Sequence, residues 1–170
     1  MDSVHLHLLI THVPVLATIF SFLVFVWGMI QSDKKYYHLA MVGFIAAGIL
    51  SIVALQSGEG AEEAVEHLAG VSESVIHTHQ ESAEVTNWIA ILLGIASIGG
   101  FLIEKYKPSL TKAYMVIILL LGLVSSGSFT YTAYLGGQVR HSEIRTQSAA
   151  NQTEQGTESE SEEHEEGELP

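Results

Sequence analysis

Four apolar runs separated by short polar segments constrain the fold of this 170-residue chain more than any other feature. The runs cover about residues 8–30, 37–55, 85–104 and 112–135. Each is close to the roughly 20 residues that a helix needs to cross the hydrocarbon core of a bilayer. Backbone amides and carbonyls find no water there, so such a run is satisfied as a helix. The sequence therefore predicts an all-α membrane protein, built as a four-transmembrane-helix bundle.

The basic residues indicate how such a bundle is oriented. Five of the seven lysines and arginines fall in the two short segments that join run one to run two and run three to run four. They are Lys34, Lys35, Lys105, Lys107 and Lys112. The positive-inside rule places these segments in the cytoplasm. We expect a bacterial inner (cytoplasmic) membrane protein whose N- and C-termini face the periplasm or exterior.

The segment between the second and third runs is polar but patterned. After residue 58, glutamates recur at helical spacing, with Val65 and Leu68 on the opposite side. Ala69-Gly70 is typical of a helix end, and Ser72 can cap a further helix. We therefore expect short amphipathic helices between spans two and three, lying over the outer mouth of the bundle.

The last segment, residues 146–170, has a different composition from the rest of the chain. Eight of the 19 acidic residues lie here, and no lysine or arginine does. Such a segment buries too little apolar surface to offset the entropy lost on ordering. We predict that it is a disordered acidic tail attached to a transmembrane domain of residues 1–145.

Seven of the nine histidines flank the runs on the predicted outer side. They are His5, His7, His12, His67, His77, His79 and His141. Neutral imidazole is the commonest protein metal ligand, and the absence of cysteine excludes thiolate sites and covalent c-type haem. His5 and His12 are seven residues apart and share a helix face, whereas His7 points elsewhere. His12 lies deepest, where an ionisable side chain is a functional candidate.

Several short motifs occur in a fixed order along the chain. They are His5-Leu6-His7, His12-Val13-Pro14, Gly58-Glu59, Gly70-Val71-Ser72-Glu73 before His79, Tyr134-Leu135-Gly136-Gly137-Gln138 and His141-Ser142-Glu143. This order resembles that of a family of small, uncharacterised bacterial four-span membrane proteins, over about residues 1–145. The family pattern often has Asn in place of Thr11 and Pro in place of Ser142. The resemblance implies the four-span fold and no reaction. It puts most weight on five of the histidines, namely His5, His7, His12, His79 and His141.

Three functions fit this histidine pattern. The first is b-type haem binding and electron transfer, with His12 and either His79 or His141 as axial ligands. The second is a copper or zinc site made by His5, His7, His12, His79 and His141 at the outer mouth. The third is a structural or assembly subunit of a membrane redox or respiratory complex, in which the imidazoles form hydrogen bonds at an interface.

The sequence carries no signature of a known catalytic machinery. It has no nucleophile elbow, no H-E-x-x-H, no phosphate-binding loop and no nucleic-acid-binding pattern. The spans hold no acidic or basic side chain near the midplane that would mark an ion path. We therefore expect a protein of the lipid bilayer that binds a cofactor or a partner, and we expect neither an enzyme nor a nucleic-acid-binding protein.

Overall fold

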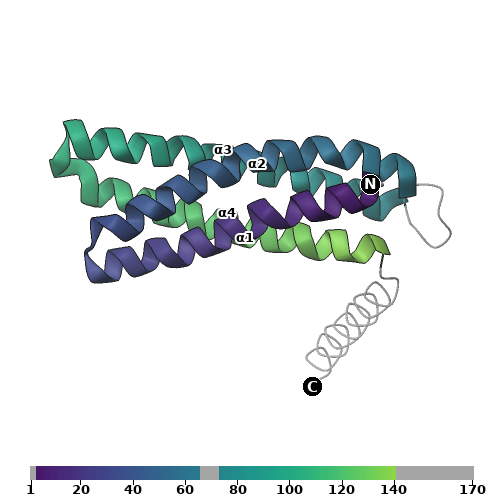
Figure 1. The fold of residues 1–170 in the computed structure, drawn as a ribbon, viewed down its shortest axis with the longest axis horizontal. Helices are drawn as coiled ribbons and strands as arrows, with labels where there is room; N and C mark the ends of the chain where they lie inside the picture. Colours follow the sequence, from purple (N-terminus) through teal and green to yellow (C-terminus); the bar gives the residue numbers. More distant parts are fainter. Residues whose placement is uncertain (1–2, 66–72, 141–170) are drawn as a thin grey trace, which may run out of the picture.

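The computed structural model describes residues 3–65 and 73–140, which form an up-and-down bundle of four long helices (Figure 1). The helices are α1 (Ser3–Gln31), α2 (Lys34–Val65), α3 (Glu73–Tyr106) and α4 (Thr111–Arg140), with a 3₁₀ turn, η1 (Pro108–Leu110), before α4. All four are long and apolar enough to cross a membrane. The described residues contain no strand, so the predicted all-α four-transmembrane-helix bundle is confirmed. The predicted acidic tail lies outside the described residues.

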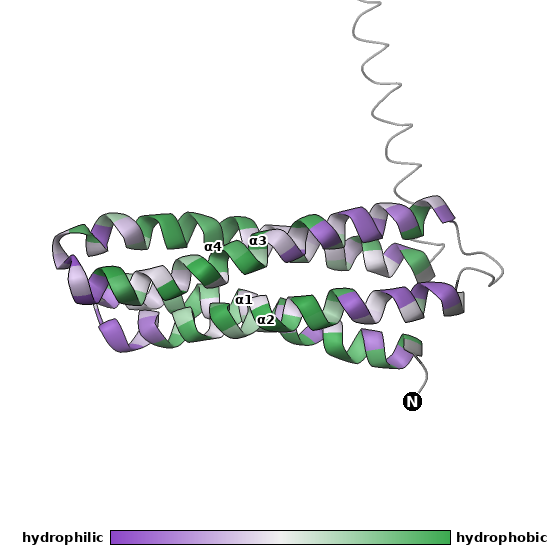
Figure 2. Ribbon diagram, turned by 90° about the horizontal axis from the view of Figure 1, so that it is seen from above, coloured by the Kyte–Doolittle hydropathy of each residue, from purple (hydrophilic) through white to green (hydrophobic). Residues whose placement is uncertain are grey.

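The alternating directions of the helices give the bundle two chemically different ends. The starts of α1 and α3 and the ends of α2 and α4 form one end of the bundle, which we call the histidine end. The lysine end is formed by the segments that join α1 to α2 and α3 to α4. Figure 2 shows apolar residues over the middle of the helices and hydrophilic residues towards both ends, as expected for helices that cross a bilayer.

The structure extends the second and third spans further than the sequence predicted. Residues 56–65 continue α2 and residues 73–84 begin α3, so within the described residues there are no separate short helices over the bundle mouth. Gly58 and Gly60 each cost a helix only about 1 kcal/mol relative to alanine. No proline interrupts either segment, and the helices therefore continue along the bundle axis.

Close helix approach depends on small residues, as is usual when lipid provides no hydrophobic drive for association. A Cβ atom added at Gly48 of α2 would lie 2.9 Å from the carbonyl oxygen of Ala90 in α3. One added at Gly94 of α3 would lie 3.6 Å from the Cα of Ile45. Towards the lysine end the interior is apolar, with Phe25, Met41, Phe44, Leu93, Met115 and Ile118 in one cluster.

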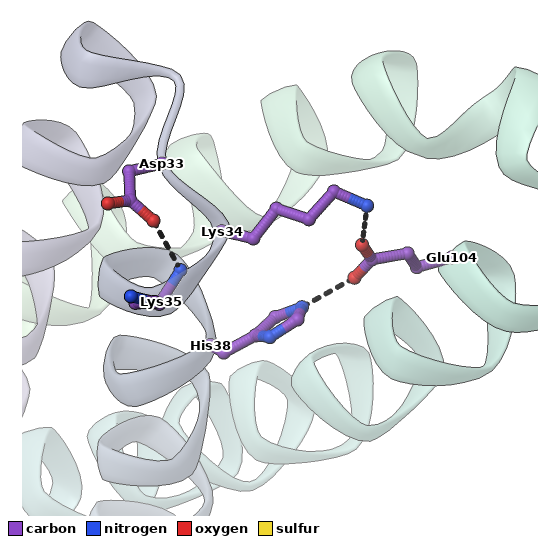
Figure 3. A network of polar contacts seen from close by, with 5 residues as sticks. All are labelled: Asp33, Lys34, Lys35, His38 and Glu104. Carbon is purple, nitrogen blue, oxygen red and sulfur yellow. Dashed lines mark hydrogen bonds and ion pairs between the residues drawn. The ribbon is translucent and has the colours of Figure 1, made fainter.

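A polar network fastens α2 to α3 at the lysine end (Figure 3). Glu104 of α3 accepts hydrogen bonds from Lys34 Nζ and His38 Nε2 of α2, both at 2.5 Å. The Glu104 side chain is 16% exposed but that of Lys34 is 68% exposed, so water screens this ion pair and its contribution to stability is small. Asp33 accepts a bond from the backbone N–H of Lys35 at 2.9 Å and so caps the start of α2.

The two hairpins, α1–α2 and α3–α4, bury equivalent positions. Each buried residue of α1 has a buried counterpart in α3, 72 residues further along the chain (86 minus 14). The pairs are Pro14 and Thr86, Thr18 and Ala90, Ser21 and Leu93, Phe25 and Ser97, and Gly28 and Gly100. In α2 and α4 the offset is 74 (115 minus 41): Met41 and Met115, Phe44 and Ile118, Gly48 and Gly122, Ser51 and Ser125, Ala61 and Leu135. The bundle is therefore an approximate repeat of one hairpin, in which His7 corresponds to His79.

Candidate imidazole site

His7 faces the interior of the bundle at the histidine end and is half-buried. Its Nδ1 lies 2.9 Å from the hydroxyl oxygen of Ser57 in α2. That hydroxyl donates its own hydrogen to the carbonyl of Ala54 at 2.7 Å, so it accepts a hydrogen bond from His7. The proton of a neutral His7 ring is therefore on Nδ1, and Nε2 keeps its lone pair.

His79 is held in the same way by the other hairpin. Its Nδ1 lies 3.1 Å from the backbone carbonyl oxygen of Thr132 in α4, and a carbonyl can only accept. This again fixes the proton on Nδ1 and leaves Nε2 as the free nitrogen. The ring lies against Gly136, where an added Cβ atom would be 3.0 Å from the ring carbon Cε1. Any larger residue at position 136 would press on the imidazole.

His7 of α1 and His79 of α3 belong to different hairpins, and both lie partly buried at the histidine end of the bundle. Each has its Nδ1 bonded to a neighbouring helix, which is how ligating histidines are usually oriented in metalloproteins. Two neutral imidazoles with free Nε2 atoms are able to coordinate a metal. We refer to them below as the imidazole pair.

The other predicted histidines are placed differently. His5 and His12 are exposed on the face of α1 opposite its buried residues, and His12 Nδ1 bonds to the carbonyl of Leu8 in its own helix. His77 is 69% exposed and lies 3.6 Å from Glu81 on the surface of α3. His67 and His141 lie outside the described residues. The structure thus brings together His7 and His79, and it does not bring His12 towards His79.

The described residues do not place the five predicted histidines in one cluster: His7 and His79 are partly buried, His5 and His12 are exposed, and His141 lies outside the described residues. Within residues 3–65 and 73–140, no three histidine, cysteine, aspartate or glutamate side chains are grouped so that they could hold a metal ion. A bare copper or zinc ion at the imidazole pair would need further ligands from elsewhere, since zinc sites use three or four protein ligands. A single pair of imidazoles suits a metal whose remaining ligands come from a cofactor.

Below the imidazole pair, hydroxyl groups connect α3 to α4. Thr86 Oγ1 lies 2.6 Å from Ser128 Oγ and 2.8 Å from Thr132 Oγ1, and Ser82 Oγ lies 2.7 Å from Thr132 Oγ1. The sequence analysis did not identify this hydroxyl cluster. Its signal is the three- and four-residue spacing of serine and threonine on one face of each helix.

Comparison with known proteins adds no assignment to these observations. No protein-family model, no curated protein and no solved structure matches this chain. The geometry of the imidazole pair and of the hydroxyl groups beneath it is therefore the basis for assigning a function.

Proposed function

We propose that this protein is a membrane-embedded b-type haem protein that transfers electrons, with His7 and His79 as the axial ligands. The observation that carries the proposal is the imidazole pair, in which both Nδ1 atoms are hydrogen-bonded, so that the Nε2 atoms of the neutral rings carry no proton. Haem needs only one or two axial ligands from the protein, because the macrocycle supplies the others. When bound, it would supply one-electron redox chemistry.

Glycines adjoin both rings: added Cβ atoms would lie 3.5 Å from His7 Cε1 at Gly58 and 3.0 Å from His79 Cε1 at Gly136. Glycine at these positions lets each imidazole approach the backbone of the neighbouring helix closely. The ligands come from two hairpins, so haem binding would also fasten these hairpins together at the end opposite to the Glu104 network.

The lysines indicate on which side of the membrane the electrons would be exchanged. Lys34, Lys35, Lys105, Lys107 and Lys112 all lie at or beside the lysine end. The positive-inside rule supports placing that end in the cytoplasm of a bacterium and the histidine end outside. Haem at the histidine end would then exchange electrons near the outer surface, with quinol, a periplasmic carrier or a subunit of a respiratory complex.

An absorption spectrum tests the proposal. Protein purified in mild detergent from haem-replete cells is expected to be red, with about one haem per chain and a Soret band that shifts when dithionite reduces the iron. Colourless protein would contradict haem binding. Elemental analysis of colourless protein would then show whether copper or zinc is present in stoichiometric amount, as the metal-site hypothesis requires.

A further inference from the structure

Some buried hydroxyl groups in the bundle have no hydrogen-bond partner within the described residues. Among the described residues, the side chains with a buried oxygen and no hydrogen-bond partner are Thr18, Thr111, Ser125 and Ser126. Thr18 and Ser125 are 0% exposed. Helical serine and threonine often bond to a carbonyl of the preceding turn, as Ser97 does at 2.8 Å. A buried hydroxyl without any partner is unfavourable, so these side chains need a ligand that the helices do not provide.

Three of these hydroxyls lie at one level, where α1 faces α4. A Cβ atom added at Gly122 of α4 would lie 3.1 Å from the ring of Phe22 in α1, which fixes the register of the two helices. The helices run in opposite directions, so one turn towards the histidine end leads to Thr18 on α1 and to Ser125 and Ser126 on α4. These three unsatisfied hydroxyls therefore lie at one level along the axis of the bundle.

Polar side chains connect this region to the histidine end. Along α4, Ser125 is followed at helical spacing by Ser128 and Thr132. Thr86 of α3 bonds to both of the latter, at 2.6 and 2.8 Å. The carbonyl of Thr132 in turn accepts the hydrogen bond from His79. A series of hydroxyl groups thus runs from the imidazole pair into the membrane-spanning part of the bundle.

The series of hydroxyl groups ends on the side that faces the lysine end. The position of a Cβ atom at Gly122 would be 3.1 Å from Phe22 and 3.3 Å from Phe44. Phe44 belongs to the apolar cluster, which continues towards the lysine end with Phe25 and Met41. Within the described residues, Ser97 and the hydroxyl oxygen of Thr111 are buried towards the lysine end but are not part of the hydroxyl series. The series therefore reaches Thr18 and Ser125 from the histidine end.

We propose that Thr18, Ser125 and Ser126 bind water, which reaches them from the histidine end along the hydroxyl series. Water fits because each hydroxyl can donate and accept, and a buried water needs two to four polar partners. The site has no charged side chain that would select an ion. In a bilayer, polar groups at this depth are satisfied only by protein or by such enclosed water. The inference rests on the unsatisfied hydroxyls and is independent of haem.

The sign of a stability change tests this water site. Thr18→Val keeps the shape of the side chain and removes the hydroxyl. If the hydroxyl binds water, the variant loses a hydrogen bond and the midpoint of thermal unfolding in detergent falls; if the hydroxyl is dry and unsatisfied, the midpoint rises. Thr78→Val on the exposed face of α3 removes a hydroxyl that bonds to the carbonyl of Ser74 in its own helix; it is the control and should change the midpoint less. A raised midpoint for Thr18→Val would overturn the proposal.

Cysteine reactivity provides a second measurement, because the natural chain has no cysteine. In the full-length protein, Ser125→Cys is compared with Val124→Cys, its neighbour, which is 54% exposed on the face that lipid would cover. A thiol beside water ionises more readily than one in hydrocarbon, so Ser125→Cys should react with methyl methanethiosulfonate at least about tenfold faster. Equal rates, or a faster reaction of Val124→Cys, would contradict a water site at Ser125.

Discussion

Replacing either His7 or His79 with alanine is expected to abolish haem binding. Under the proposal, each substitution would remove one axial ligand and release one hairpin from the haem. Loss of a group that only orients a ligating histidine already weakens metal affinity by roughly 10- to 100-fold, so loss of the ligand itself should exceed that. The haem-to-protein ratio of the purified variants, measured as the pyridine haemochrome, gives the result directly.

The exposed histidines of the same helix provide matched controls. His5→Ala and His12→Ala remove imidazoles that lie on the opposite face of α1, and both variants are expected to retain haem. The contrary result, in which His12→Ala loses haem and His7→Ala keeps it, would favour the axial pair predicted from the sequence. Loss of haem in all four variants would mean that the substitutions act on folding and not on one site.

Gly48→Val is expected to destabilise the bundle strongly. Its added Cβ atom would lie 2.9 Å from the carbonyl oxygen of Ala90, and a backbone atom cannot rotate away as a side chain can. Helices α2 and α3 must then move apart. Overpacking of this kind costs about 3 kcal/mol. The measurement is the free energy of unfolding in mixed detergent and dodecyl sulfate.

Gly127→Val is the control for this substitution. It introduces the same β-branched side chain into a membrane-spanning helix, but no atom lies within 4 Å of its added Cβ. We expect little change in unfolding free energy beyond the difference in helix propensity, which is below about 1 kcal/mol. If both variants lost the same stability, the close approach of α2 and α3 would not be a stabilising contact.

The fold was predictable because the bilayer leaves few alternatives. Four apolar runs of sufficient length are enough to predict four helices, since no other open structure satisfies its backbone in hydrocarbon. The ends of the second and third helices were not predictable in this way. Gly58 and Gly60 follow the predicted second span, yet a glycine costs a helix too little to end it, and α2 continues past both.

The candidate site was predicted only in part, because hydropathy does not distinguish lipid from protein interior. His7 precedes the buried Pro14 by seven residues, which returns it to almost the same helix face. His12 is two residues from Pro14 and therefore points away from the interior. The apolar residues of α1 do not show which face is buried. Thr18 and Ser21 are the signal that marks this face, because polar side chains avoid lipid.

The bonds that orient the imidazole pair were beyond sequence analysis. Ser57 is 50 residues from His7, and Thr132 is 53 residues from His79. Only the packing of α2 on α1 and of α4 on α3 brings them together. Gly136, the first glycine of the Gly136-Gly137 pair, lies against the ring of His79.

The most direct test of the central claim is the electron paramagnetic resonance spectrum of the oxidised, full-length protein. Iron held between His7 and His79 should give the low-spin ferric signal of two imidazole ligands. The same signal should disappear in His7→Ala and in His79→Ala. A high-spin signal in the natural protein, or a low-spin signal that survives both substitutions, would contradict a haem held between the two hairpins.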